Sequence, residues 1–222
     1  MIMTEYGKYI EGTTDFCITE PDIPRNWYNY FWNDNYVTFT SQVGAGESFV
    51  QDDLGRRIKL VADRGFFITE GDRHWGIAGL PVEEARDSYK CIHARGRSDI
   101  ITENYGIRST VSITVPTEDS VELWQVKVEN LTAEKRSIRV CAFMGSAFDA
   151  GYGRQGYNTE ISCIDGDILY ITKRTNMYGT YVTAHGFMAL ANRDGYCGRI
   201  FCSVSFMSLF TMFVDVSSYW CV

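Results

Sequence analysis

The stretch that decides the fold reads Ile107-Arg108-Ser109-Thr110-Val111-Ser112-Ile113-Thr114-Val115. Its odd positions are mostly apolar and its even positions are polar, so a strand here would have one buried and one solvated face. Pro116 follows directly, and a proline ends a strand because it has no N–H group to donate to the ladder. This stretch therefore predicts a strand that covers a core on one side.

The next two segments extend the pattern. Val121–Val128 alternates less cleanly, and Asn130 with the Thr-Ala-Glu-Lys residues that follow predicts a turn. Ser137–Met144 then alternates again, and it places on one face Ile138, Val140, Ala142 and Met144. Short strands separated by turn residues are typical of an antiparallel sandwich.

The rest of the chain adds strands and little helix. Asp165-Gly166-Asp167 separates two apolar runs, which predicts a hairpin turn. No segment before residue 199 has a sustained helical stripe, although Leu80–Tyr89 could hold one short helix. We expect an all-β chain built as a large antiparallel β-sandwich.

Composition excludes several classes of function. The 222 residues carry a net charge of −7 without a basic cluster, so we expect no nucleic-acid partner. Seven scattered cysteines without CxxC spacing indicate buried thiols in a reducing compartment rather than disulfides or a zinc site. The first residues lack the apolar core of a signal peptide, so we expect a cytoplasmic protein.

The last 23 residues differ from the rest in composition. Residues 200–222 are mostly apolar and carry a single charge, Asp215. Their length would permit a transmembrane helix, but several serines, the central Asp and the lack of a flanking basic cluster argue against membrane insertion. We expect two parts, a β-sandwich domain at 1–199 and an aberrant or frameshifted tail at 200–222.

The densest signal lies near the start, in a run that reads Pro24-Arg25-Asn26-Trp27-Tyr28-Asn29-Tyr30-Phe31-Trp32-Asn33-Asp34-Asn35-Tyr36-Val37-Thr38-Phe39-Thr40-Ser41-Gln42-Val43-Gly44-Ala45-Gly46-Glu47-Ser48-Phe49. It predicts a polar, aromatic loop, a strand and a glycine turn. Gly44 and Gly46 allow a positive φ or a close backbone approach. They are not a dinucleotide fingerprint, because the third glycine and the helix are missing.

This run resembles the opening of the cellobiose and chitobiose phosphorylase family, which includes cyclic β-1,2-glucan synthases. The resemblance spans about residues 6–198 and ends near Gly198, where the composition changes. Its further motifs are Arg56-Arg57-Ile58, Asn104-Tyr105-Gly106-Ile107-Arg108-Ser109, Val121-Glu122-Leu123-Trp124-Gln125-Val126 and Ala184-His185-Gly186-Phe187-Met188. Glu47 and Val50 stand where many members have aromatic residues.

The resemblance implies a β-supersandwich of the galactose-mutarotase-like kind that supports a catalytic (α/α)6 barrel and a homodimer. It also implies an inverting phosphorylase acting on β-linked gluco-oligosaccharides. Inorganic phosphate attacks the anomeric carbon while a barrel carboxylic acid protonates the leaving sugar. The family's catalytic aspartate and phosphate-binding residues have no matching positions here, so we expect this chain alone to be inactive. No further cofactor is implied.

The sequence offers few candidate site residues, and none of them is catalytic. The adjacent pairs Asp52-Asp53 and Glu83-Glu84 would face opposite ways on a strand, and Asp165 and Asp167 flank a turn. Three distant histidines predict no metal site. The glycine-rich loop at 149–157 resembles a part of the family that approaches the acceptor sugar, so Arg154 and Gln155 are the candidate substrate-binding residues.

Three hypotheses about the whole chain stay open at this point. The first is a support domain in which Trp27, Tyr28, Trp32 and Tyr36 pack or form an interface. The second is a free-standing carbohydrate-binding module in which those aromatic residues form a sugar platform. The third is a non-functional gene fragment, as the composition of the tail suggests.

Overall fold

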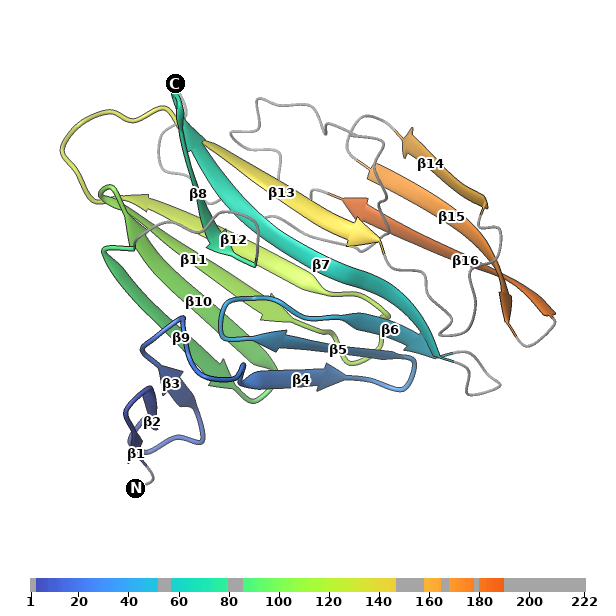
Figure 1. The fold of residues 1–222 in the computed structure, drawn as a ribbon, viewed down its shortest axis with the longest axis horizontal. Coiled ribbons are helices and arrows are strands. Elements are labelled where there is room, and N and C mark those ends of the chain that lie inside the picture. Colours follow the sequence, from blue (N-terminus) through green and yellow to red (C-terminus); the bar gives the residue numbers. More distant parts are fainter. Residues whose placement is uncertain are drawn as a thin grey trace.

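The computed structural model of the chain describes residues 3–51, 57–79, 86–146, 158–164, 168–177 and 180–189. Every helix or strand in these ranges is a β-strand, and the strands pair antiparallel in three sheets (Figure 1). The predicted all-β antiparallel fold is therefore confirmed. Arg154 and Gln155 lie outside the described residues, as does the segment 200–222.

Seven strands form the largest sheet, in the order β1-β2-β3-β9-β10-β11-β12. They are β1 (Met3–Thr4), β2 (Gly7–Tyr9), β3 (Phe16–Ile18), β9 (Ser88–Ala94), β10 (Arg97–Asn104), β11 (Ile107–Thr114) and β12 (Leu123–Asn130). Along β11 the odd residues are buried and the even ones half-buried, as the alternation predicts. The prediction of a possible helix at Leu80–Tyr89 is wrong for its last two residues, because Ser88 and Tyr89 belong to β9 and pair with β10.

A second sheet has the order β13-β7-β6-β5-β4, with β8 paired to β7. Its strands are β4 (Tyr28–Trp32), β5 (Tyr36–Ser41), β6 (Ser48–Gln51), β7 (Arg57–Glu70), β8 (Arg73–Ala78) and β13 (Arg139–Ser146). The predicted apolar face is confirmed for Ile138, Val140 and Ala142, which pack against the core, whereas the side chain of Met144 lies outside the described part. In this order β4 is an edge strand.

A three-stranded sheet consists of β14 (Asn158–Ile164), β15 (Ile168–Met177) and β16 (Thr180–Ala189). Ile164 of β14 lies opposite Ile168 of β15, so the two strands form the hairpin that the intervening Asp-Gly-Asp predicts. In Figure 1 this sheet lies beside the end of β13.

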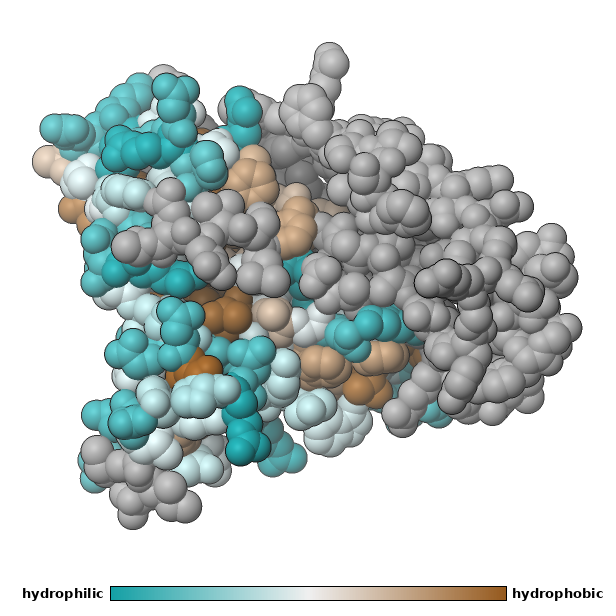
Figure 2. Space-filling view, in the orientation of Figure 1, coloured by the Kyte–Doolittle hydropathy of each residue, from teal (hydrophilic) through white to brown (hydrophobic). Residues whose placement is uncertain are grey.

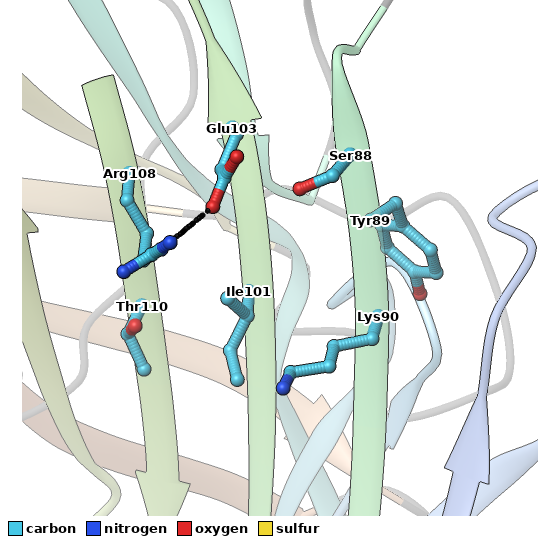
Figure 3. A pocket seen from close by; sticks show the side chains of 7 residues that line it. All are labelled: Ser88, Tyr89, Lys90, Ile101, Glu103, Arg108 and Thr110. Carbon is cyan, nitrogen blue, oxygen red and sulfur yellow. Dashed lines mark hydrogen bonds and ion pairs between the residues drawn. The ribbon is translucent and has the colours of Figure 1, made fainter. Parts of the chain in front are cut away.

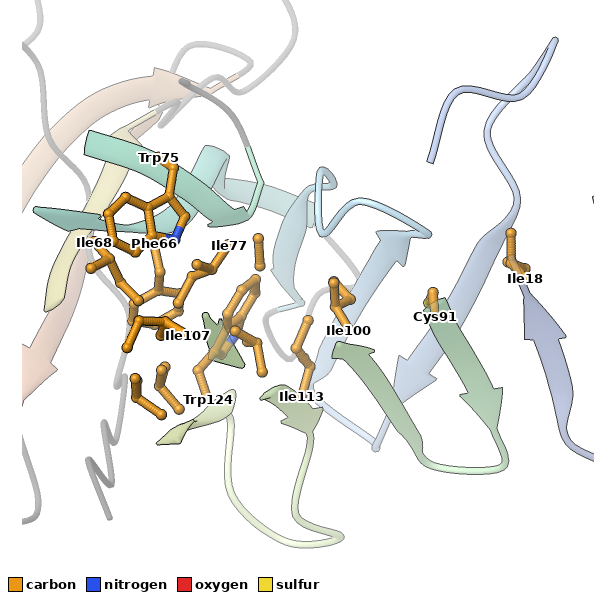
Figure 4. Packing of buried hydrophobic residues seen from close by; sticks show 14 of the residues in the cluster. Ile18, Phe66, Ile68, Trp75, Ile77, Cys91, Ile100, Ile107, Ile113 and Trp124 are labelled. Carbon is orange, nitrogen blue, oxygen red and sulfur yellow. The ribbon is translucent and has the colours of Figure 1, made fainter. Parts of the chain in front are cut away.

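The core lies between the two larger sheets. Trp75 and Phe66 come from the second sheet and Trp124 from the first, and all three are completely buried (Figure 4). The rings of Phe66 and Trp124 meet with their centroids 5.6 Å apart. Contacts of this kind join the sheets face to face, as in a sandwich.

The glycine turn between β5 and β6 needs its glycines. Gly44 has a φ of 89°, which is a left-handed conformation that favours glycine. A side chain on Gly46 would collide with the carbonyl oxygen of Phe39. Both of the reasons that the sequence suggested for these glycines are therefore present.

Candidate functional site

The aromatic run divides at β4 into an outward and an inward set. Tyr28, Tyr30 and Trp32 alternate along the strand and are 42%, 54% and 72% exposed. Between them, Phe31 is buried and Asn29 is half-buried, because successive side chains of a strand point to opposite faces. The three outward residues are called the aromatic row below.

Phe39 of β5 supports two members of the aromatic row. Its ring lies 5.1 Å from that of Tyr28 in an edge-to-face arrangement and 5.5 Å from that of Tyr30. Tyr30 and Phe39 are direct partners in the β4–β5 ladder. At the start of the row, Asn26 donates to the Tyr28 hydroxyl oxygen over 3.3 Å. These contacts restrict the rotamers of the tyrosines.

The inward set packs as the support-domain hypothesis requires. Tyr36 is 2% exposed and Phe31 is 3% exposed. Trp27 is half-buried and packs edge-to-face on Phe16, with the ring centroids 5.2 Å apart. Packing is therefore confirmed for Trp27 and Tyr36, whereas Tyr28 and Trp32 are exposed.

A buried polar network centred on Glu122 joins residues of β5 and β6 to Trp124 of β12. One carboxylate oxygen accepts hydrogen bonds from the hydroxyls of Tyr36 at 3.0 Å and Ser48 at 2.5 Å. The other oxygen accepts from the indole N–H of Trp124 at 2.7 Å. Burial, and then the negative charge of Glu122, raise the pKa of Tyr36 well above its ordinary value, so its hydroxyl stays a donor.

Arg64 completes the network. Its Nε lies 3.3 Å from the second Glu122 oxygen, and the two side chains are 1% and 0% exposed. Its Nη2 donates to the Thr38 hydroxyl and to the Phe39 carbonyl, at 3.1 and 2.8 Å. The guanidinium carbon also lies 5.1 Å above the centre of the Trp124 ring. This ion pair joins the two sheets. Because it is buried away from solvent, it cannot contact a substrate.

This network was not predicted from the sequence, although the sequence carries a signal for it. Glu122 has the same parity as Trp124 and Val126, which point inward from β12. Arg64 has the same parity as Phe66 and Ile68 on β7. A charged residue at an inward position of an alternating strand needs a buried partner. Those positions could have been identified, but their pairing could not.

A second polar cluster anchors the segment that leads into β4. His93 Nε2 lies 3.0 Å from the carbonyl oxygen of Trp27, which can only accept, so Nε2 carries the proton. His93 Nδ1 then accepts from the Ser98 hydroxyl at 2.8 Å. Burial lowers the pKa of His93, and the hydrogen bond to Trp27 opposes that shift. The neutral imidazole therefore joins β9 to the aromatic run.

A shallow hollow of about 460 Å3 lies on the seven-stranded sheet (Figure 3). Its lining residues are Ser88, Tyr89, Lys90, Ile101, Glu103, Arg108 and Thr110. Glu103 is the only carboxylate among these described lining residues, and it pairs with Arg108 at 2.7 Å. The described part of the lining therefore does not supply the pair of carboxylates that direct glycoside hydrolysis would use.

Residues 14–150 match the family described as glycosyl hydrolase 94, supersandwich domain. This match covers more than half of the chain. The chain belongs to that family. Membership confirms the supersandwich architecture that the motifs predicted, and it agrees with the two large antiparallel sheets packed face to face.

Curated relatives of this glycosyl hydrolase 94 domain are phosphorylases. A solabiose phosphorylase of Paenibacillus borealis is 26% identical over 174 residues, 72% of this chain and 22% of the relative. A 3-O-beta-D-glucopyranosyl-beta-D-glucuronide phosphorylase of the same organism is 30% identical over 135 residues, 60% of this chain and 17% of the relative. An N,N'-diacetylchitobiose phosphorylase of Vibrio proteolyticus is 24% identical over 156 residues, 65% of this chain and 20% of the relative. The match spans about a fifth of these relatives.

Most of the candidate site residues named from the sequence lie outside the residues that the structure describes. Outside the described residues are Asp52-Asp53, Glu83-Glu84, Arg154 and Gln155, and the Asp165–Asp167 turn. His185 belongs to β16, but its side chain is also outside the described part. The substrate-binding role of Arg154 and Gln155 stays a prediction.

Two absences apply only to the ranges that the structure covers. Within them, no three His, Cys, Asp or Glu side chains gather as metal ligands would. The same ranges hold no helix with the length and hydropathy needed to cross a membrane.

Proposed function

We propose that this domain is the N-terminal support and carbohydrate-binding part of an inverting glycoside phosphorylase that acts on β-linked gluco-oligosaccharides with inorganic phosphate. The observation that carries this proposal is the family match over residues 14–150, together with the phosphorylase activity that the relatives' names state. Because those relatives are several times longer than the match, the proposal places the chemistry in a separate catalytic domain.

The buried carboxylates of the described residues support that division. Glu122 is completely buried, and both of its oxygens accept hydrogen bonds. Asp99 is 8% exposed, accepts from Ser112 and pairs with Arg97. A general acid must reach the leaving sugar oxygen within hydrogen-bond distance, and neither carboxylate has a free approach for a sugar. These groups therefore stabilise the sandwich.

A domain exchange tests the support role. In the N,N'-diacetylchitobiose phosphorylase of Vibrio proteolyticus, the segment matching this chain would be replaced by the corresponding residues of this chain. We expect the chimera to release sugar 1-phosphate from N,N'-diacetylchitobiose, because the exchanged domain supports and does not perform the chemistry. The intact chain, assayed alone with cellobiose, laminaribiose, sophorose and N,N'-diacetylchitobiose, should release none.

Two controls make the exchange decisive. A chimera that carries Glu122→Ala should lose activity through misfolding, since it breaks the network between the sheets. A folded chimera without activity would contradict the support role. Turnover by the intact chain that a point mutation within residues 1–199 abolishes would contradict the placement of chemistry in another domain.

A further inference from the structure

The aromatic row lies on the edge strand β4, where its three side chains are 42–72% exposed although Phe39 contacts two of them. Figure 2 shows pale and brown residues together over the sheet that contains β4, β5 and β6. Tyr28, Tyr30 and Trp32 account for three of the seven large hydrophobic or aromatic side chains that are exposed among the described residues. They stand at every second position of one strand, so they project from the same face.

Geometry makes the row a linear surface. Alternate residues of a strand are about 7 Å apart, so three of them span about 13 Å. Phe39 holds the two tyrosine rings from the side, and the buried Phe31 fixes the strand below. A surface that is ordered before binding loses less entropy when a ligand arrives.

The chemistry of the row suits a neutral ligand with hydroxyl groups. Residues 28–32 and 36–41 carry no charge, and the charged residues nearest along the chain, Arg25 and Asp34, lie beyond the ends of the strand. Further across the same sheet, Glu47 and Lys59 neutralise each other in an ion pair. Aromatic rings offer an apolar face to the C–H groups of a sugar ring, while tyrosine hydroxyls exchange hydrogen bonds with its edge. Nucleic-acid bases also stack on aromatic rings, but they need a positive groove, and this chain has a net charge of −7.

The exposed area is too small for a stable protein interface. With about 150–250 Å2 per aromatic side chain, the exposed fractions of 42%, 54% and 72% correspond to roughly 250–420 Å2 for the row. Stable protein interfaces bury about 800 Å2 on each partner. Phe39, Val37 and Phe49 beside the row are already half-buried and add little to it. The area fits a short oligosaccharide chain.

We propose that Tyr28, Tyr30 and Trp32 form a binding platform for a neutral β-linked glucan chain. The β-linkage rests on the proposed function, whereas the neutral saccharide chemistry rests on the row itself. The platform lies on the outer face of β4. It would hold a glucan at a site that performs no chemistry.

Affinity electrophoresis of the full chain tests the platform. The gels would contain hydroxyethyl cellulose, laminarin or a linear β-1,2-glucan, with glycogen and a polymer-free gel for comparison. We expect at least one β-glucan to retard the chain, and glycogen not to. Trp32→Ala and Tyr30→Ala should each weaken the retardation about tenfold, the size expected for the loss of one stacking contact.

Tyr9→Ala is the matched control. The exposed fraction of Tyr9, 43%, is nearly the same as that of Tyr28, 42%. Tyr9 belongs to β2, which lies in the other sheet. Its loss should leave the retardation unchanged. Thermal melting of each variant shows whether a loss of retardation comes from unfolding, and any variant that melts early is replaced by the milder Trp32→Leu or Tyr30→Leu.

Three results would overturn the platform. The first is no retardation by any β-glucan, and the second is retardation that Trp32→Ala and Tyr30→Ala leave unchanged. The third is self-association in sedimentation velocity that Trp32→Ala abolishes without any glucan binding, which would make the row a protein interface. An active chimera with no glucan retardation refutes the platform alone. An inactive, folded chimera with retardation refutes the support role alone.

Discussion

The buried Glu122–Arg64 pair and the exposed aromatic row reverse the usual distribution of residue types. Two charged side chains are sealed between the sheets, while three aromatic ones stand in solvent at an edge strand. The pair is tolerable because each group has hydrogen-bond partners. No such internal requirement explains the row. The difference indicates that the pair serves the fold and the row serves binding.

The largest expected effect comes from breaking the pair. Glu122→Ala leaves the guanidinium of Arg64 buried without its counter-charge, and removing one partner of a buried pair costs about 3–5 kcal/mol. Urea unfolding of the full chain measures this loss. Glu129→Ala is the control, because it removes a partly exposed pair with Lys127 and should cost less than about 1 kcal/mol. Equal losses in the two variants would show that the buried pair has no special role.

Adjacent residues of β4 give the next test. Phe31→Ala removes a ring that is 3% exposed and should cost about 3–5 kcal/mol. Trp32→Ala removes a ring that is 72% exposed and should change the free energy of unfolding by no more than about 0.5 kcal/mol. Chemical denaturation of both variants measures the difference. If Trp32→Ala destabilises as much as Phe31→Ala, the row belongs to the core and cannot be a platform.

The smallest expected effect concerns pH. The pKa of His93 is lower in the folded chain than its ordinary value of 6.5, so the unfolded chain binds the extra proton more readily. The contribution of His93 to stability is therefore complete above pH 6.5 and is lost as the pH falls through the lower pKa of the folded state. Unfolding midpoints at about pH 7.5 and about pH 5.5 measure this loss.

Two variants isolate His93 from other groups that titrate. His93→Gln should reduce the difference between the two midpoints, whereas His74→Gln, which changes an exposed residue of β8, should not. The same drop in midpoint for His93→Gln as for the unmodified chain would rule out the imidazole as its source.

Much of the fold follows from local patterns. Alternation identified β11 over its whole length and the inward face of β13, because a half-buried strand must keep its apolar residues on one side. The need for the turn glycines could also be predicted, since the positive φ of Gly44 and the close approach of Gly46 to Phe39 both arise within their own hairpin. The family motifs indicated the supersandwich, which the match over residues 14–150 confirms.

The division of the aromatic run into inward and outward side chains could not be predicted from the sequence. In β4 both faces carry aromatic rings, so the period-two contrast that marks an inward face is missing from Tyr28 to Trp32. Pairing with β5 and packing over the seven-stranded sheet place Phe31 inside and Trp32 outside. Likewise, the positions of Glu122 and Arg64 signalled buried charges, but their partnership depends on two sheets meeting. Contacts between residues so far apart in the chain leave no local pattern, and only the packed sandwich brings them together.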